Sequence, residues 1–134
     1  DVDVARRPAI DERRAPRGGQ IARTLDAAGR VKAVIGSPGG SRIILYVTKA
    51  IVGIIDWKLD AQSAIDLANF GSRNGPFEIE TALAGALPAL HMLKRGHQVA
   101  SPDMTSGLHI VMRAPNGTLT GGADPRREGI AKGE

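Results

Sequence analysis

The sequence predicts a mixed α/β fold, because strand-like and helix-like segments intermix and an Asn-Gly hairpin joins the last strands. Segments with a two-residue apolar period, typical of half-buried strands, alternate along the chain with segments of helical period. Glycine makes up 17 of the 134 residues, above its usual share of about 7%, which predicts many tight turns. The absence of cysteine excludes a disulfide scaffold and a cysteine-ligated metal site. We therefore expect one α/β domain whose strands are not all parallel.

The N-terminal segment, residues 1–24, differs in composition from the rest of the chain. It carries six arginines among proline, glycine, alanine and acidic residues, and its few large aliphatic residues follow no period. Such a segment buries too little apolar surface to offset its ordering entropy, so we expect it to be largely disordered. A basic arm for nucleic acid is the alternative, but acidic residues dilute its charge and it has no aromatic residue for stacking. We expect no nucleic-acid partner.

The next segment predicts a turn, a strand and a buried helix. Asp26–Gly29 has the composition of a turn, and Val31–Ile35 shows the alternation of a short strand. Over residues 42–56 the less apolar positions recur at steps of four and three, which is a helical stripe. These positions are Arg42, Tyr46, Lys49, Gly53 and Asp56. The run between them is apolar but too short for a membrane span, so we expect a buried helix.

The second half of the chain predicts alternating helices and strands. Asp60 can cap a short helix with apolar residues Ala61, Ala64, Ile65 and Ala68 on one face. A loop over 69–76 precedes a helical region over 81–95, in which Pro88 is either a kink or a first-turn residue and Gly96 is the stop. Short strands are expected over 97–100 and 108–113, and Asn116-Gly117 predicts a hairpin that returns through Leu119.

The turn Gly36–Ser41, between the first strand and the buried helix, is the candidate functional site. Two successive glycines let the backbone approach a ligand, and N–H groups at a helix start carry the positive end of the helix dipole. Such groups can bind a phosphate, a carboxylate or the oxyanion of a tetrahedral intermediate. The sequence contains no P-loop, no dinucleotide-binding glycine motif and no nucleophile elbow. A purely structural turn and an anion site both remain open at this point.

No metal or cofactor site is expected. His91, His97 and His109 are separated by six and twelve residues, with no carboxylate at the spacing of a metal-ligand set. Solvated or hydrogen-bonded roles are the ordinary interpretation of such histidines. The sequence 124–127, Asp-Pro-Arg-Arg, predicts a local ion-pair corner.

Four segments resemble, in order and spacing, the γ-glutamyltransferase family, whose members are also called glutathione hydrolases. The segments are GSPGGSRII at 36–44, FGSRNGP at 70–76, Gly-His-x-Val at 96–99 and GGADPRREG at 121–129. The resemblance covers about residues 25–134. Just upstream the family has a paired-serine segment, whereas residues 1–24 contain no serine. We hypothesise that residues 1–24 derive from a shifted reading frame, which the coding DNA would test.

The resemblance implies a fold and a chemistry. The family fold is the four-layer αββα sandwich of N-terminal-nucleophile hydrolases, of which this chain would form a part. The family precursor cleaves itself into a large and a small subunit, and the new N-terminal threonine becomes the nucleophile. Its acyl-enzyme takes the γ-glutamyl group from glutathione or other γ-glutamyl compounds and passes it to an amino acid, a peptide or water. By position, Gly39 and Gly40 correspond to the backbone donors to the oxyanion, and Ser37 and Pro38 shape the substrate-binding turn.

The resemblance covers only the C-terminal part of the small subunit. We therefore expect no nucleophile in this chain, no activity of the chain alone, and a partner in the remainder of the precursor. It also implies a periplasmic or extracellular location if the full bacterial precursor is exported. The alternative is an orphan module without catalytic activity that binds small anions or a protein partner.

Overall fold

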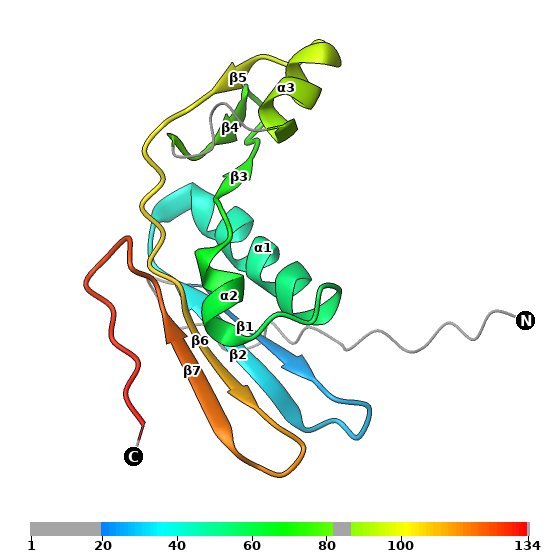
Figure 1. The fold of residues 1–134 in the computed structure, drawn as a ribbon, viewed down its shortest axis with the longest axis vertical. Helices are drawn as coiled ribbons and strands as arrows, with labels where there is room; N and C mark the ends of the chain where they lie inside the picture. The colour runs from blue at the N-terminus through cyan, green and yellow to red at the C-terminus, as the bar shows by residue number, and fades with distance from the viewer. Residues whose placement is uncertain (1–19, 82–86, 134) are drawn as a thin grey trace, which may run out of the picture.

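The computed structural model describes residues 20–81 and 87–133, and these form two sheets flanked by helices (Figure 1). The larger sheet has the strand order β1-β2-β6-β7, with every neighbouring pair antiparallel. Its strands are β1 (Gln20–Leu25), β2 (Val31–Ser37), β6 (His109–Arg113) and β7 (Leu119–Ala123). The smaller sheet has the order β3-β4-β5, and β4 and β5 are parallel. Its strands are β3 (Phe70–Gly71), β4 (Phe77–Ile79) and β5 (Val99–Ala100). The predicted mixed α/β fold is confirmed.

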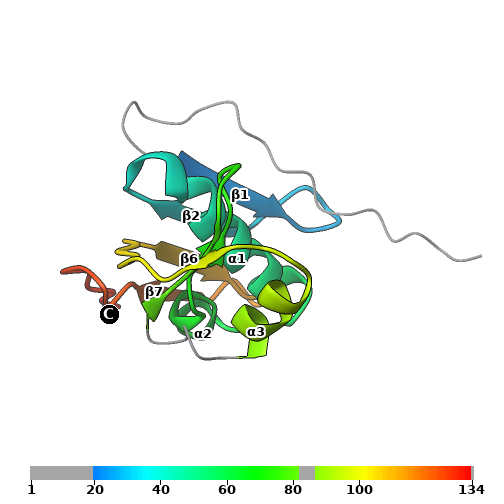
Figure 2. The ribbon, with the colours of Figure 1, turned by 90° about the horizontal axis from the view of Figure 1, so that it is seen from above.

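The helices divide between the two sheets. A 3₁₀ turn, η1 (Gly40–Arg42), leads directly into α1 (Ile43–Ile55), and α2 (Ala61–Asp66) follows. Both α1 and α2 cover one face of the larger sheet, while the smaller sheet and α3 (Leu87–Lys94) lie beyond one end of it (Figures 1 and 2). Within the described ranges no helix is both long enough and apolar enough to cross a membrane.

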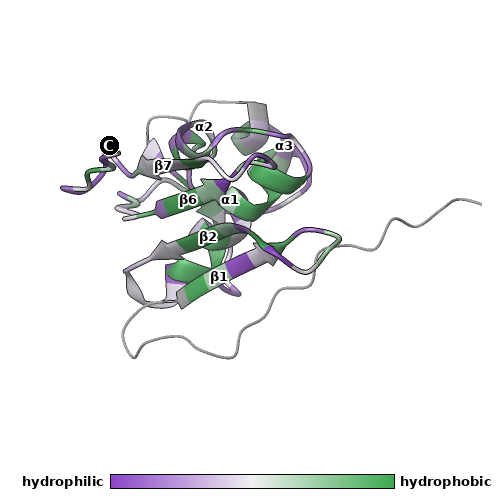
Figure 3. Cartoon of the chain, turned by 90° about the horizontal axis from the view of Figure 1, so that it is seen from below, coloured by the Kyte–Doolittle hydropathy of each residue, from purple (hydrophilic) through white to green (hydrophobic). Residues whose placement is uncertain are grey.

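The core lies between α1, α2 and the larger sheet. Ile35 of β2, Ile54 of α1 and Ile65 of α2 are all at most 2% exposed. Figure 3 shows β2, β6 and α1 as largely hydrophobic segments. Successive side chains of a strand point to opposite faces, and Val34 and Val111, which pair across β2 and β6, are exposed. The larger sheet therefore carries apolar side chains on the face that α1 and α2 leave open.

Local signals place most of the element boundaries correctly. Asp60 caps α2 by accepting a hydrogen bond from the Ser63 backbone N–H at 2.9 Å. Pro88 is the second residue of the described part of α3, and Gly96 has φ +83° just after the helix. Gly117 has φ +90° in the hairpin between β6 and β7. These positions behave as turn chemistry predicts.

Two expected boundaries are wrong. The disordered segment was expected to reach residue 24, but Gln20–Leu25 pairs with β2 and the Thr24 side chain is fully buried. Main-chain hydrogen bonds to β2 supply the ordering that the apolar side chains of this segment lack. The loop expected over 69–76 contains β3, and Asn69 at its start is fully buried. Residues 1–19, and residues 82–86 of the expected helical region, lie outside the described residues.

Candidate functional site

The glycine turn connects the end of β2 to the start of η1. The Ser37 side chain anchors this turn through two hydrogen bonds. The Ser37 hydroxyl is buried, donates a hydrogen bond to the Pro38 carbonyl at 2.9 Å and accepts one from the Gly107 backbone N–H at 3.2 Å. The Pro38 ring also packs against Gly107, whose absent Cβ would lie 2.9 Å from Pro38 Cγ. The turn is therefore anchored to a segment seventy residues away in the sequence.

Gly39 and Gly40 form the exposed part of this turn, and both have positive φ. Gly39 has φ +124° and Gly40 has φ +57°. Residues other than glycine rarely adopt this region. Among the described residues, no group accepts a hydrogen bond from either backbone N–H. The turn thus presents two adjacent amide donors at the start of a helix, an arrangement that suits an anion or an oxyanion.

The loop 70–76 docks beside the turn through one glutamate, Glu78. Arg42 donates to both carboxylate oxygens of Glu78, from Nε and Nη2, at 2.9 Å each. Arg73 donates from Nη2 to Glu78 Oε1 at 2.9 Å and from Nη1 to the Ser41 hydroxyl at 2.8 Å. Hydrogen bonds from Arg42 and then Arg73 lower the pKa of Glu78 from 4.5 to about 2. Two of the four family-like segments are thereby held together by charge.

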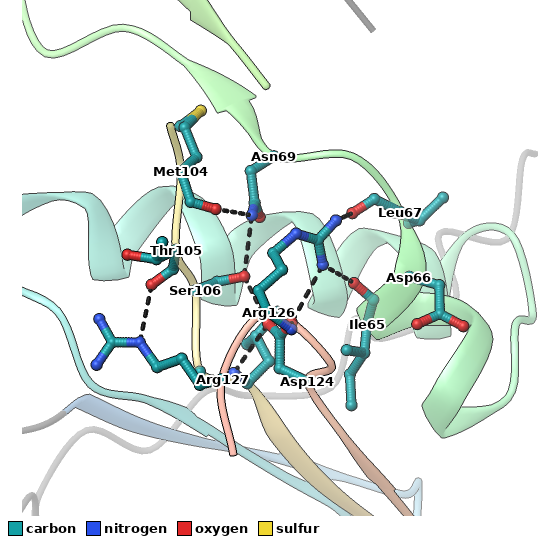
Figure 4. A network of polar contacts seen from close by, with 12 residues as sticks. Ile65, Asp66, Leu67, Asn69, Met104, Thr105, Ser106, Asp124, Arg126 and Arg127 are labelled. Atoms are coloured by element: carbon teal, nitrogen blue, oxygen red, sulfur yellow. Dashed lines mark hydrogen bonds and ion pairs between the residues drawn. The ribbon is translucent and has the colours of Figure 1, made fainter. Parts of the chain in front are cut away.

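The segment 121–129 approaches the turn from another side, through Arg127. The Arg127 Nε–H donates to the Thr105 carbonyl at 3.0 Å, as Figure 4 shows. Its Cδ lies 2.9 Å from the position that a Cβ on Gly107 would occupy. Its Nη2 lies 3.7 Å from the position of a Cβ on Gly39. The guanidinium therefore lies beside the glycine turn.

A buried polar cluster, the Arg126 network, lies on the other side of the same segment (Figure 4). Its side chains are Lys49, Asn69, Glu80, Ser106, Asp124 and Arg126. Arg126 donates to Glu80 at 2.5 and 2.8 Å and to Asp124 at 3.2 Å. The predicted ion-pair corner is confirmed, but it is larger than expected because Glu80 comes from a distant part of the chain.

Asp124 is the centre of this network. It is fully buried, and its Oδ2 accepts hydrogen bonds from the Ser106 hydroxyl at 2.5 Å and the Leu108 backbone N–H at 3.1 Å. Its Oδ1 accepts from the backbone N–H of Arg126 at 3.0 Å. Burial raises the pKa of Asp124, but the hydrogen bonds from Ser106, Arg126 and Leu108 outweigh it and hold the pKa below its ordinary value. Asp124 is therefore an ionised structural group.

Lys49 completes the network from α1. It is 5% exposed, and its ammonium donates to the carbonyls of Ile65, at 3.1 Å, and Leu67, just after α2. Arg126 donates to the same two carbonyls at 3.3 Å. Burial, and next the charge of Arg126, lower the pKa of Lys49 from 10.5 to about 8. Lys49 belongs to the predicted helical stripe, but the burial of its charged end was not predicted.

The four predicted site residues, Ser37, Pro38, Gly39 and Gly40, thus lie in one anchored turn. Sequence reasoning missed the charged residues around it, of which Arg127 lies nearest to Gly39. The repeated arginine in segment 121–129 was the available signal, and it was interpreted as a local corner. The three histidines, for which solvated or hydrogen-bonded roles were expected, are exposed. No group of three or more potential metal ligands occurs among residues 20–81 and 87–133.

The fold and the turn together define an α/β protein in which two adjacent glycine amides at a helix start have no acceptor among the described residues. Comparison with known protein families identifies one family for most of this chain. The family described as gamma-glutamyltranspeptidase matches residues 12–134, so this chain belongs to the γ-glutamyltranspeptidase family. The family resemblance predicted from the four segments is confirmed, and the match begins before the expected start at Leu25.

Curated relatives include an acylase and a glutathione hydrolase. The chain is 35% identical over 102 residues to the acylase ACY 1 proenzyme of Pseudomonas sp. strain SE83. It is 33% identical over 99 residues to the glutathione hydrolase proenzyme of Escherichia coli strain K12. The two matches cover 75% and 73% of this chain but only 18% and 17% of the relatives. The chain therefore spans less than a fifth of the length of these relatives.

Solved structures agree with the fold. An acivicin-inhibited γ-glutamyltranspeptidase superimposes with a TM-score of 0.73 at 27% identity, over 90% of this chain and 66% of that chain. A mutant of Helicobacter pylori γ-glutamyltranspeptidase gives 0.71 at 26% identity, over 89% and 67%. A cephalosporin acylase from Bacillus halodurans shares the fold, with a TM-score of 0.72 at 22% identity.

Proposed function

We propose that this chain supplies the oxyanion site of an acyl-transfer enzyme of the γ-glutamyltranspeptidase family. The amides of Gly39 and Gly40 would donate to the oxygen of the tetrahedral intermediate. One observation carries the proposal: both amides lack acceptors among the described residues while the turn that holds them is anchored by Ser37. Donors that are fixed before the reaction stabilise developing charge without reorganisation, and one such donor contributes about 3 kcal/mol in other enzymes.

The proposed reaction needs a nucleophile from outside this chain. A threonine hydroxyl, activated by its own free α-amine, attacks the γ-carbonyl carbon of the donor, and the carbonyl oxygen becomes the oxyanion. Collapse of this intermediate breaks the C–N bond, releases the protonated amine and leaves an ester on the threonine. Water or an amine acceptor then attacks the ester, through a second oxyanion in the same turn. The threonine and the large subunit belong, in this proposal, to the remainder of the precursor.

The exposed apolar side chains on the open face of the larger sheet support the proposal that another part of the precursor packs there. Val34 and Val111 are exposed there at 38% and 48%, although they lie on the two central strands. Apolar side chains in the middle of a sheet are ordinarily covered by a second layer. We infer that a second sheet from the remainder of the precursor packs on this face, which completes the four-layer αββα sandwich.

The substrate class rests on the relatives. The E. coli relative is a glutathione hydrolase proenzyme, which supports glutathione or another γ-glutamyl compound as donor and an amino acid, a peptide or water as acceptor. The Pseudomonas relative is an acylase proenzyme, so a different acyl group is the second candidate. Backbone amides in the glycine turn contact only the oxyanion and suit both donors.

An NMR titration tests the proposal. The chain, labelled with ¹⁵N-glycine, gives few amide cross-peaks, and those of Gly39 and Gly40 can be assigned by single substitution. We expect both cross-peaks to shift on addition of glutamate, while phosphate at equal concentration has a smaller effect. A preference for phosphate would instead favour the orphan anion-binding module. The isolated chain should show no hydrolysis of a chromogenic γ-glutamyl substrate, and turnover that persists after removal of contaminating enzyme would contradict this.

A further inference from the structure

The Arg127 side chain is positioned by contacts at its stem and at its Nε–H. Gly107 leaves room for its stem, because a Cβ there would lie 2.9 Å from Arg127 Cδ. Its Nε–H is directed by the Thr105 carbonyl at 3.0 Å. A side chain that is already fixed loses little conformational entropy when it binds a ligand. Arg127 is thus a preorganised group, although it lies at the surface.

Within residues 20–81 and 87–133, the terminal nitrogens of Arg127 have no hydrogen-bond or ion-pair partner. Among the described residues, neither a carboxylate nor a carbonyl accepts a hydrogen bond from its Nη1 or Nη2. Arg126, the preceding residue, is the opposite case, since its guanidinium donates hydrogen bonds to Glu80, Asp124 and two carbonyls. Figure 4 shows the two guanidinium groups directed to opposite sides of the segment. The donors left on Arg127 face outward from the network.

These donors lie next to the glycine turn. The 3.7 Å between Nη2 and the Cβ position of Gly39 is a contact distance, so a molecule bound at the turn would meet the guanidinium. An open hollow of about 600 Å³ adjoins Arg127, and Thr105, Pro125 and Glu128 also line it. A guanidinium with two free N–H₂ groups binds a carboxylate with charge-assisted hydrogen bonds. Glu128 in the same hollow disfavours a multiply charged anion there.

We propose that Arg127 binds a carboxylate of the substrate whose oxyanion the Gly39 and Gly40 amides hold. The inference rests on the proposed function and assigns to that site a side chain from this chain that touches substrate. The carboxylate has two possible sources, the α-carboxylate of the acyl donor and the carboxylate of an amino acid or peptide acceptor. Arg127 therefore selects for carboxylate-bearing molecules on one side of the reacting carbon.

The test compares Arg127→Gln with the wild-type chain, both labelled with ¹⁵N-glycine. L-Glutamine and its methyl ester represent the donor with and without its carboxylate, and glycylglycine and its amide represent the acceptor. The dissociation constant of each probe is measured from the Gly39 and Gly40 cross-peaks. Arg113→Gln is the matched control, since it removes the same charge from an exposed arginine beside Gly117 in the β6–β7 hairpin. Arg127→Lys keeps the charge but loses the bond to Thr105.

We expect Arg127→Gln to weaken one carboxylate probe by about tenfold, and Arg113→Gln by less than twofold. The probe affected, glutamine or glycylglycine, identifies the source of the carboxylate, and its ester or amide should be insensitive to the substitution. Arg127→Lys should give an intermediate affinity. The glycine cross-peaks also report whether each variant is folded.

Two results would overturn the inference, and only the second would also overturn the proposed function of the glycine turn. If the wild-type chain binds a probe at the turn and Arg127→Gln binds it equally well, only the role of Arg127 is wrong. If no probe moves the Gly39 or Gly40 cross-peaks of the folded wild-type chain, the oxyanion turn and the role of Arg127 both fail.

Discussion

The Arg126 network and the glycine turn use their hydrogen-bonding groups in opposite ways, although adjacent residues connect them. Ser106 and Arg126 belong to the network, while Gly107 and Arg127 contact the turn or its anchor. In the network nearly every polar group has a hydrogen-bond partner. Among its described side chains, Asn69 Oδ1 is a buried acceptor without one. At the turn, the amides of Gly39 and Gly40 and the terminal nitrogens of Arg127 have no acceptors among the described residues.

The difference separates structural from functional polar groups. A buried and satisfied network holds segments in place, and the loss of one member leaves others unpaired. Unpaired donors at the surface are hydrogen-bonded by water in both the folded and the unfolded chain, so they add little to stability. They can exchange that water for a ligand. Substitutions in the network should therefore change stability, and substitutions in the turn should change binding.

Substitution of Asp124 should have the largest effect on stability. Asp124→Ala removes the acceptor of the Ser106 hydroxyl and the Leu108 N–H and takes one carboxylate from Arg126. Removing one partner of a buried charged group costs about 3–5 kcal/mol, so unfolding in urea should move to much lower denaturant concentration. Asp56→Ala, at an exposed position whose side chain has no hydrogen bond among those described, should stay within about 0.5 kcal/mol. Similar losses for both variants would show that the network is not the structural centre.

Lys49 offers a pH-dependent test of the network. The unfolded chain has a lysine of ordinary pKa 10.5, whereas the folded pKa is about 8 because of burial and Arg126. Between these values the unfolded state binds more protons, so the Lys49 contribution makes stability rise with pH, by up to about 3 kcal/mol. The difference in unfolding free energy between wild type and Lys49→Met, measured from pH 7 to 10.5, should show this rise.

Lys49→Met should itself fold, because Arg126 also donates to the two carbonyls that Lys49 contacts. The exposed Lys94→Met variant should keep the pH dependence of the wild type. A wild-type minus Lys49→Met difference that stays flat over this range would mean that Lys49 is not buried in its charged form.

Features that depend on neighbouring residues could be predicted from the sequence. The cap at Asp60, the turn glycines Gly96 and Gly117, and the glycine turn itself follow from residue type and local spacing. The strand over 31–35 and the helix over 42–56 follow from their periods, because each is long enough for a period to be counted. Strands β3, β4 and β5 have two or three residues each, so no period could reveal β4.

Features that depend on distant residues could not be predicted in this way. Arg126 pairs with Glu80, 46 residues earlier, and Arg42 with Glu78, 36 residues later. Charged side chains on a polar stripe are ordinarily solvated, so the stripe gave no sign that Lys49 would be 5% exposed. Identifying these partners requires knowing which strands and helices lie side by side.

Gly40 tests the turn with the smallest expected change in stability. A Cβ on Gly40 would meet nothing within 4 Å, so Gly40→Ala changes only the backbone preference at φ +57°. We expect a loss of about 1 kcal/mol, because alanine disfavours the left-handed region. Gly75→Ala is the matched control, since its Cβ is equally free and its φ is not in that region. It should be neutral or slightly stabilising, because alanine restricts the unfolded chain.

The two variants should differ more in binding than in stability. A shift of the Gly40 backbone toward negative φ reorients the two amides of the turn, so glutamate should bind Gly40→Ala at least tenfold more weakly than Gly75→Ala. The thermal midpoint of each variant and the titration of its remaining turn glycine measure the two quantities separately. If Gly40→Ala loses stability but keeps the wild-type affinity, the positive φ serves only the chain reversal, and the turn belongs with the network as a structural element.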